Sequence, residues 1–440
     1  MAFSKTLAEM EQSVPDSEAR KRLAAFFDED SFKELDKFLS ADGEISAVVA
    51  GYGTVSGAGV YAFAQDSSVK GGAVSKSAAL KIKKIYELAA KSGLPVVGFY
   101  DSKGGDINEG MAVLSAYGDI MKASSAVSGV VPQIAVVCGV CAGCAAMLAA
   151  MADIAVVTEK SELFLTSPFN TPDGKLEGAG TAVNAAKSGT VSVLAKDDAE
   201  AVAKARKLIS ILPANNISMA GNDDFSENNV DISAGLSGRA LITAVADGSS
   251  VTELGDKFGN VITALASVNW ATVAFVAADN GGKLSSDDCN KIARFVQFAD
   301  VFSIPVVTFI NNEGFAGSSA AELAGSVRNC ARLAQVYASA TTAKINVITG
   351  KAFGAAYAAF DSADMSFAWE NAQIAPMNPE AGKAFMGEEL VTSPFAAASL
   401  GMVDGVIDPA DTRDAVDTAV GLCADKRVSG PSRKHINFTF

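Results

Sequence analysis

The chain has 440 residues, of which 49% are hydrophobic and 20% are charged, and its formal net charge is −14. This composition supports large buried cores and excludes an intrinsically disordered protein. An acidic chain without clustered Lys and Arg also argues against nucleic acid as a partner, because phosphate binding needs concentrated positive charge. The length is sufficient for two domains of about 200 residues each.

The opening segment, 1–42, places apolar side chains such as Leu23, Phe26 and Leu35 at helical spacing among charged ones. We expect a helical lead-in that packs on the main body. The segment 1–26 carries charges of both signs and no apolar core, so no secretory signal is predicted and we expect a cytoplasmic protein.

Further along, β-branched runs alternate with amphipathic helices. Strands are predicted at 45–53, 60–66 and 94–100, and a helix is predicted at 77–91. Another helix is predicted at 197–212. This alternation is typical of an α/β fold.

The most informative stretch is 136–147, where an apolar β-branched run reaches a Gly-rich turn and an Ala/Met-rich helix follows at once. Such a turn points the N–H groups of a helix start at whatever lies above it, and these groups can hold an oxyanion. A second such turn occurs at 347–357. Two turns of this kind predict two oxyanion sites.

Two other interpretations of the first turn are weaker. The stretch 134–151 carries no charge, but the glycines and cysteines at its centre favour a buried strand, turn and helix over a membrane span. Cys138, Cys141 and Cys144 follow metal-ligand spacing, yet the strand and helix would not bring three sulfurs together. We therefore expect no metal site and no membrane-spanning segment.

The chain also contains an internal duplication, since four landmarks recur at a nearly constant offset of 210 or 211 in the numbering. Two of these pairs are Lys81 with Lys291 and Gly143 with Gly354. The polar connector 215–231 suits a surface linker. We predict two domains, at 1–218 and 232–440.

Acid–base side chains are scarce. A serine hydrolase needs a histidine base, and the single histidine is His435, close to the last residue of the sequence. No phosphate-binding loop with the Gly-Lys-Ser/Thr ending is present. This pattern suits a reaction in which the reactant or a cofactor supplies the base.

Several segments together resemble the carboxyltransferase subunits of biotin-dependent acyl-CoA carboxylases and decarboxylases, the family of the propionyl-CoA carboxylase β-subunit and the methylmalonyl- and glutaconyl-CoA decarboxylase α-subunits. The resemblance runs in order along nearly the whole chain, through 60–66, 69–72, 101–110, 128–134, 141–145, 164–168, 304–309, 351–357 and 401–407.

The resemblance implies two tandem crotonase-like domains, the first for acyl-CoA and the second for biotin. It also implies that Gly143 and Cys144 form an oxyanion hole for the thioester enolate. Ala355 and Ala356 would form another for the ureido oxygen of biotin. Substrate contacts are implied at Gly71, Gly72, Ala73, Gly104, Gly105, Ala142, Phe353, Gly354 and Tyr357.

Some residues depart from the family pattern and indicate a divergent, compact member. The family's Gly-Gly is here Gly143-Cys144 in the first turn and Gly354-Ala355 in the second, and a side chain at Cys144 raises the question of substrate access and of backbone φ. Ala358 stands where propionyl-type members often have Asp. The acyl chain therefore stays open.

No Met-Lys-Met biotinylation motif is present, so the resemblance implies biotin on a separate biotin carboxyl carrier protein. A biotin carboxylase subunit as partner would make the complex a carboxylase. A sodium-pump membrane subunit would make it a malonyl-, methylmalonyl- or glutaconyl-CoA decarboxylase, which the compact form favours slightly. We expect a homo-oligomer, a dimer or a larger ring of dimers, with each active site between two subunits.

Two alternatives stay open. Because glycines of the family pattern are replaced, one alternative is that the chain is a non-catalytic assembly subunit of such a complex. A biotin-independent crotonase-type enzyme, such as a hydratase, would need paired carboxylates as acid and base.

Overall fold

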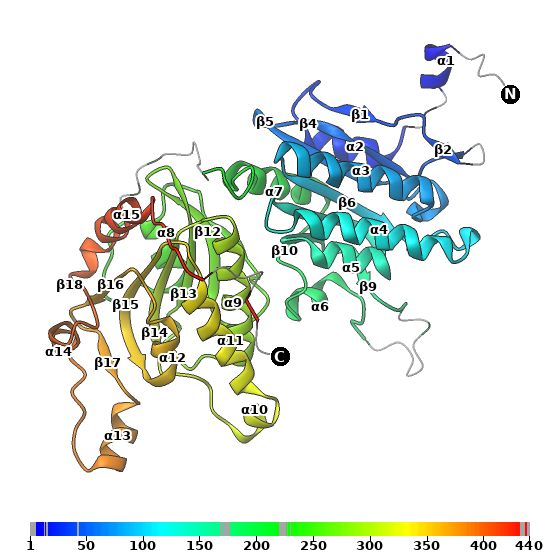
Figure 1. Ribbon diagram of the computed structural model, residues 1–440. Helices are drawn as coiled ribbons and strands as arrows, with labels where there is room; N and C mark the ends of the chain where they lie inside the picture. The colour runs from blue at the N-terminus through cyan, green and yellow to red at the C-terminus, as the bar shows by residue number, and fades with distance from the viewer. Residues whose placement is uncertain are drawn as a thin grey trace. The chain divides into compact units, whose positions relative to one another are not determined.

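The structure is a computed structural model of the chain (Figure 1). It describes residues 6–12, 14, 16–41, 44–167, 170, 177–219, 226, 228, 230–431 and 436–437. Pro168 and His435, which belong to segments named above, lie outside these residues. The chain divides into two compact units, Met1–Ser218 and Met219–Phe440, which we call the first and second unit.

The first unit is built on one sheet with the strand order β1-β4-β5-β6-β7-β8-β10, in which β9 also pairs with β7. The hairpin β4–β5 and the edge pair β1–β4 are antiparallel, and the remaining pairs are parallel. The strands are β1 (Lys33–Leu35), β4 (Val48–Val55), β5 (Ala58–Gln65), β6 (Val96–Ser102), β7 (Gln133–Ala142), β8 (Ile154–Thr158), β9 (Glu162–Phe164) and β10 (Val193–Ala195), with a separate small hairpin of β2 (Ser40–Ala41) and β3 (Glu44–Ile45).

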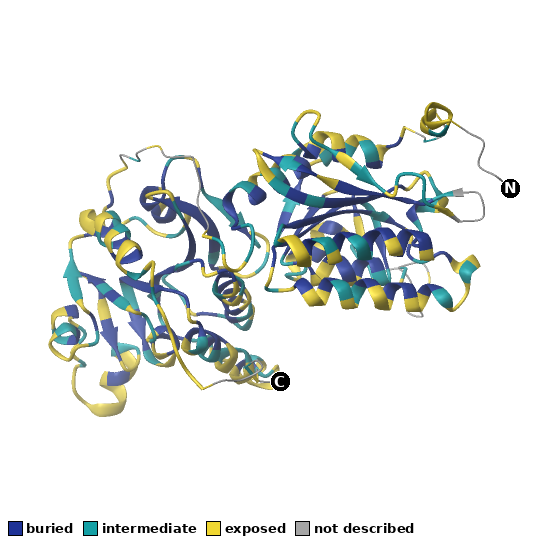
Figure 2. Cartoon of the chain, turned by 45° about the horizontal axis from the view of Figure 1, so that its top comes forward, coloured by how far each residue is buried: buried dark blue, intermediate teal, exposed yellow. Residues whose placement is uncertain are grey.

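Helices cover both faces of this sheet, so its strands are buried on both sides. Two consecutive residues of β6 show this: Phe99 packs edge-on against Phe26, while Tyr100 contacts Phe63, which in turn contacts Tyr86. Figure 2 shows the helices with buried inner faces and exposed outer faces. The helices are α1 (Leu7–Gln12), α2 (Glu18–Phe26), α3 (Lys76–Ser92), α4 (Ala112–Val127), α5 (Cys144–Met151), α6 (Ala182–Lys187) and α7 (Asp198–Ile211), with 3₁₀ turns η1 (Lys70–Gly72) and η2 (Ile107–Glu109).

The second unit repeats this plan. Its sheet has the order β11-β12-β13-β14-β15-β16-β18, and β17 pairs with β15. The strands are β11 (Thr252–Leu254), β12 (Ile262–Val268), β13 (Ala271–Ala278), β14 (Val306–Asn312), β15 (Lys344–Phe353), β16 (Met365–Trp369), β17 (Gln373–Ala375) and β18 (Gly405–Ile407). The helices are α8 (Gly238–Val245), α9 (Ser286–Val301), α10 (Ser319–Leu323), α11 (Ser326–Ser339), α12 (Gly354–Phe360), α13 (Pro379–Met386), α14 (Pro394–Ser399) and α15 (Thr412–Cys423), with the 3₁₀ turn η3 (Pro409–Asp411).

The duplication extends to the register of single residues. In the first unit Val140 lies opposite Glu162, and in the second unit their counterparts Lys351 and Gln373 lie opposite each other. Both units also carry a register shift at the same place, between β6 and β7 in the first and between β14 and β15 in the second. The predicted α/β class and internal duplication are confirmed.

The expected helical lead-in is correct only in part. Glu18–Phe26 is a helix, but Lys33–Leu35 forms an edge strand that pairs with Ala50 to Tyr52 of β4. Asp36 then has a positive φ of 50°, which ends the extended segment. Pairing with the sheet edge therefore outweighs the helical spacing of the apolar residues here.

The uncharged stretch 134–151 forms β7, the turn and α5. Among the described residues, the chain has no helix that is long and apolar enough to cross a membrane.

Candidate active site at two duplicated turns

The first turn places a glycine where only glycine fits comfortably. Between β7 and α5, Gly143 has φ 59° and ψ −123°, a conformation that side chains with a Cβ rarely adopt. The Gly143 N–H donates to the Phe164 carbonyl at 2.9 Å, so this donor is used within the sheet. The helix begins at Cys144, and first-turn N–H groups have no acceptor inside their own helix. The turn therefore presents the Cys144 N–H as its leading donor.

This geometry answers the question raised by Cys144. Cys144 is the first helical residue and is absent from the residues with positive φ. The position that requires glycine is Gly143, and there the glycine is kept. A side chain at Cys144 is therefore compatible with the backbone of the turn.

The second turn has the same backbone. Gly354 has φ 62° at the start of α12, where Gly143 has φ 59°. Ala355 is exposed and Ala356 is fully buried, so the two predicted donors lie in different surroundings. Tyr357 is buried, and its hydroxyl donates to the Met402 carbonyl at 3.4 Å.

Two further segments named from the sequence converge on the first turn. The Lys103 N–H donates to the Gly71 carbonyl, and the Val74 N–H donates to the Gly104 carbonyl at 2.9 Å. A Cβ on Gly72 would lie 2.0 Å from the Asp101 carbonyl oxygen, so only glycine permits this approach. Gly104 in turn lies beside the Ala142 carbonyl, 3.7 Å from the position of a Cβ. The structure thus brings 71–74, 103–105 and 142–144 together.

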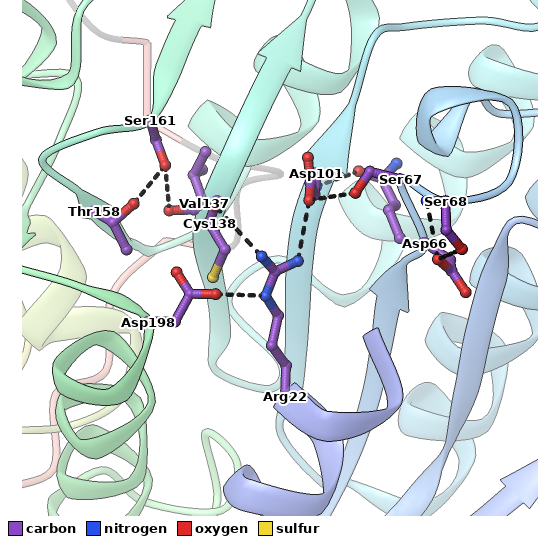
Figure 3. A network of polar contacts seen from close by, with 11 residues as sticks. Arg22, Asp66, Ser67, Ser68, Asp101, Val137, Cys138, Thr158, Ser161 and Asp198 are labelled. Atoms are coloured by element: carbon purple, nitrogen blue, oxygen red, sulfur yellow. Dashed lines mark hydrogen bonds and ion pairs between the residues drawn. The ribbon is translucent and has the colours of Figure 1, made fainter. Parts of the chain in front are cut away.

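A network of charged side chains connects α2 and α7 to the strands β6 and β7 near this turn (Figure 3). Arg22 reaches from α2 to donate to Asp101 at 3.2 Å, to Asp198 at 2.7 Å and to the Cys138 carbonyl at 3.4 Å. Asp101 also accepts from the Ser67 hydroxyl at 2.8 Å. The Arg22 side chain is only 10% exposed, which strengthens these contacts.

The network surrounds the place where β7 departs from regular pairing with β6. Tyr100 lies opposite Val137, but Ser102 lies opposite Cys141, so the residues between them form a bulge on β7. A Cβ on Gly139 would lie 2.2 Å from the Asp101 carboxylate. Arg22 thereby connects α2 and α7 to the bulge that leads into the turn.

Sequence reasoning missed Arg22 altogether. It lies 79 residues from Asp101 and 176 from Asp198, and no local pattern distinguishes it from its charged neighbours. The structure pairs the Asp101 carboxylate with this cation. The loop acid Asp106 is also paired, with Lys70 at 3.2 Å.

A cavity lies beside each turn. The first, about 370 Å³, is bounded by α5, β9 and α6, and the second, about 480 Å³, by α12, β17 and α14. Their walls correspond residue by residue: Met147 to Ala358 and Leu165 to Pro376 at an offset of 211, and Asn184 to Ala396 at 212. Both volumes lie in the range of small-ligand sites.

The walls of the two cavities differ in chemistry. Three positions on the first wall are polar and their counterparts are apolar, namely Asn184, Ser188 and Thr190 against Ala396, Leu400 and Met402. The duplicated cavities are therefore suited to different ligands.

Of the cysteines near the first turn, Cys141 is buried and Cys138 and Cys144 are partly buried. Burial raises the pKa of Cys138 to about 12 and also raises that of Cys141. Thiols of this kind are poor nucleophiles at neutral pH. Within the described ranges, no group of three or more His, Cys, Asp or Glu side chains could hold a metal ion.

Known proteins are similar to this chain over most of its length. The family described as "Carboxyl transferase domain" matches residues 16–387. The methylmalonyl-CoA decarboxylase subunit alpha of Veillonella parvula is 35% identical, covering 95% of this chain and 92% of that protein. The propionyl-CoA carboxylase beta chain of Roseobacter denitrificans is 33% identical, covering 95% and 93%.

A solved structure matches as well. The transcarboxylase 12S crystal structure, described as a hexamer assembly with hydrolysed methylmalonyl-coenzyme A bound, is similar with a TM-score of 0.89 and 33% identity. The match covers 99% of this chain and 94% of that one.

Proposed function

The chain belongs to the carboxyl transferase domain family and is a biotin-dependent acyl-CoA carboxyltransferase with two tandem crotonase-like domains, and we propose that its first unit binds the acyl-CoA and its second unit the biotin. One observation carries this division: the two turns share a backbone, while the cavities beside them differ in polarity.

The first turn stabilises charge on the substrate. Loss or gain of a carboxyl group at the carbon next to a thioester passes through an enolate, whose negative charge lies on the thioester oxygen. The Cys144 N–H at the start of α5 is aimed above the turn and donates to that oxygen. The loops that carry Gly71, Gly104 and Gly105 adjoin the turn, and a Cβ on Gly71 would lie 2.8 Å from Lys103 and one on Gly105 2.9 Å from Val113, so these glycines allow the loops to pack closely there.

The wall of the first cavity fits a short acyl group that carries a carboxylate. Asn184 offers an amide donor to such a group, of the malonyl or methylmalonyl type, while the Ser188 hydroxyl donates to the Ala185 carbonyl at 3.0 Å and lies 3.3 Å from the Thr190 hydroxyl. None of the described residues that line this cavity is charged, which keeps the environment of the departing or arriving carboxyl group weakly polar.

The second turn and its cavity fit biotin. The cavity is apolar along Ile374, Leu400 and Met402, which suits a bicyclic ring with a thioether, and it opens onto Gly354 and Ala355. When bound, biotin supplies the nitrogen that gives or takes the carboxyl group. The N–H groups of Ala355 and Ala356 hold the ureido oxygen, Tyr357 lines the adjoining wall, and the buried Phe353 directly precedes the helix.

The chain acts as a subunit of a multi-subunit biotin-dependent complex. We further propose a biotin carboxyl carrier protein as the biotin donor and a homo-oligomer of dimers in the cytoplasm. The direction of transfer then depends on whether a biotin carboxylase or a sodium-pump membrane subunit completes the complex. All six cysteines are free, as expected for a reducing compartment.

The test is exchange of labelled carboxyl between methylmalonyl-CoA or malonyl-CoA and free biotin, catalysed by the purified chain. We expect exchange that depends on both reactants. Absence of exchange from a folded, oligomeric protein across a panel of short acyl-CoA thioesters would contradict the proposal and favour the non-catalytic assembly subunit. Hydration of crotonyl-CoA without biotin would favour the crotonase-type alternative.

A matched pair of variants tests the division between units. Asn184 and Ala396 occupy corresponding positions on the two cavity walls. Asn184→Trp should raise KM for acyl-CoA about tenfold with little change in KM for biotin, and Ala396→Trp should do the reverse, since each ring fills one cavity. The opposite pattern would exchange the roles of the two units.

A further inference from the structure

The cavity beside the second turn contains a carboxylate that its counterpart lacks. Among the described residues that line it, Asp361 is the charged one. Asp361 directly follows α12 as its C-cap residue, three residues after Ala358, which lines the same cavity. Residues three apart lie on one helix face, so the two side chains share the wall.

The duplication shows that this carboxylate is specific to the second unit. Asp361 corresponds at an offset of 211 to Ala150, which lines the first cavity with a methyl group. Apart from Tyr357, which stands in place of Ala146, the remaining differences between the walls make the second cavity more apolar, so the charged Asp361 is an exception. A lone charged group in an apolar wall usually has a ligand-recognition role when the cavity binds a small molecule.

The surroundings of Asp361 leave it able to accept a hydrogen bond from a ligand. The Tyr357 hydroxyl lies in hydrogen-bonding reach of the Asp361 carboxylate and also of the Met402 carbonyl, and it has one proton to give. Asp361 is exposed, yet partial burial raises its pKa above the usual value of 3.8, and the Tyr357 contact opposes that rise. A carboxylate has more acceptor sites than one hydroxyl can satisfy.

We propose that Asp361 accepts a hydrogen bond from an N–H of the biotin ureido ring, while the N–H groups of Ala355 and Ala356 hold the ureido oxygen. The inference rests on the proposed function of the second unit. In a cyclic urea one carbon bears the oxygen and the N–H nitrogens. A protein that binds it must therefore offer donors to the oxygen and an acceptor to an N–H.

The dimensions agree with this assignment. Ala355 and Asp361 are six residues apart on the chain of α12, which is about 9 Å along a helix axis. A urea oxygen and nitrogen with a hydrogen bond at each end span about 8 Å. One ring can therefore reach both ends of the helix segment, and the pair of contacts fixes its orientation.

The experiment compares Asp361→Asn and Asp361→Leu with wild type in the exchange reaction. We expect KM for biotin to rise roughly tenfold in the Leu variant and less in the Asn variant, whose side-chain oxygen still accepts an N–H bond. KM for acyl-CoA should stay within about twofold, because it belongs to the other unit. Asp425→Asn, at an exposed carboxylate, serves as the matched control.

A biotin analogue gives an independent measurement. 2-Iminobiotin replaces the ureido oxygen by a nitrogen and forms a cation, which a carboxylate binds more strongly than a neutral ring. Inhibition of exchange by this analogue should weaken about tenfold in Asp361→Asn relative to wild type. This variant is nearly isosteric, so its circular dichroism and thermal unfolding should match those of wild type.

The outcomes separate the two levels of the argument. No exchange by wild type would contradict the proposed function itself. Exchange by wild type, with KM for biotin and iminobiotin inhibition unchanged in both Asp361 variants, would overturn the role of Asp361 alone. A rise in KM for acyl-CoA without a rise for biotin would also overturn it.

Discussion

The two strand–turn–helix segments share a backbone and differ in what supports them. In the first unit Asp101 lies over Gly139 at the bulge, and Arg22 neutralises it. In the second unit the corresponding residue is Asn311, which lies over Gly350 and accepts the Lys351 N–H at 2.9 Å. The uncharged Asn311 amide thus supplies the oxygen over the bulge and needs no cation beside it. The bulge needs a side-chain oxygen, and the charge of Asp101 adds a link to α2 and α7.

The two cavities likewise share a backbone and differ in their side chains. Duplication preserved the path of the chain around each turn, while the side chains on the walls diverged toward polar groups in one unit and apolar groups with one carboxylate in the other. Backbone donors can serve any oxyanion, so the same turn suits both a thioester and a urea. Specificity then belongs to the walls.

The largest effect on stability is expected from Arg22→Ala. Removing the guanidinium leaves the half-buried Asp101 carboxylate unpaired, and we expect the first unit to lose about 3 kcal/mol. Both tryptophans, Trp270 and Trp369, lie in the second unit, so urea unfolding followed by tryptophan fluorescence reports that unit and circular dichroism reports both.

The control and the rescue come from the same comparison. Arg239→Ala removes an exposed ion pair and should cost less than about 1 kcal/mol. Adding Asp101→Asn to Arg22→Ala should recover much of the loss, because Asn occupies that position in the second unit. No recovery in the double variant would show that the two bulges are supported differently.

The turn glycines should have the largest effect on catalysis. The methyl group added by Gly143→Ala would lie 3.8 Å from the nearest atom, the Leu165 carbonyl oxygen, so it would not clash. The backbone at this position, with φ 59° and ψ −123°, is nevertheless strained for any residue other than glycine. Relief of that strain reorients the peptide before Cys144, and we expect kcat for exchange to fall about 100-fold. Gly354→Ala should behave alike.

Gly118→Ala is the control for these substitutions, since Gly118 lies within α4 with open space around it. It should leave kcat unchanged and stabilise the protein by up to about 1 kcal/mol. Loss of activity in only one of the two turn variants would mean that one turn is catalytic and the other structural.

The two units should respond to acid in opposite ways. Burial raises the pKa of Asp279 in the second unit to about 6, although the carboxylate accepts the Gly238 N–H. The folded state then keeps a proton that the unfolded chain releases, so the stability of the second unit falls as pH rises from about 4 to about 6. Asp279→Asn should remove this decline and raise stability at pH 7 by up to about 2 kcal/mol.

In the first unit, the hydrogen bond from the Gly57 N–H, together with those from Arg206 and the Ser56 N–H, holds the pKa of Asp28 well below its usual value, although burial opposes this shift. Its contribution to stability is present above about pH 4 and is lost as pH falls. Urea titrations between pH 3 and pH 8, read by fluorescence and by circular dichroism, measure both trends. Parallel curves for the two signals would contradict the expected difference.

The smallest effects are expected from Cys144→Gly and Ala355→Gly, which restore the second glycine of the family pattern in each turn. Both residues lie in the first turn of a helix, where glycine costs up to about 1 kcal/mol in stability. We expect kcat to change less than threefold, since the N–H groups remain. A large gain in activity for Cys144→Gly would show that the Cys side chain obstructs the substrate.

The sequence by itself determined the class of fold, the duplication and the family. Each depends on patterns that are local or that repeat at a constant interval: apolar runs of strand length, helical spacing at 77–91 and glycine at the two turns. These patterns record backbone conformation directly, since φ near +60° selects Gly143 and Gly354 wherever the rest of the chain lies. The acyl-CoA and biotin roles of the two domains came through the family resemblance and stay proposals.

Only the tertiary structure decided what surrounds the turns. In the folded chain the Gly143 N–H donates to a carbonyl of β9, and Leu35 lies in an edge strand where a helix was predicted. Arg22 binds two carboxylates that lie 79 and 176 residues away in the sequence. The tertiary structure also placed Asp361 in a cavity with α14. Contacts of this kind leave no periodic trace in the chain, because they depend on how strands and helices far apart in sequence pack against one another.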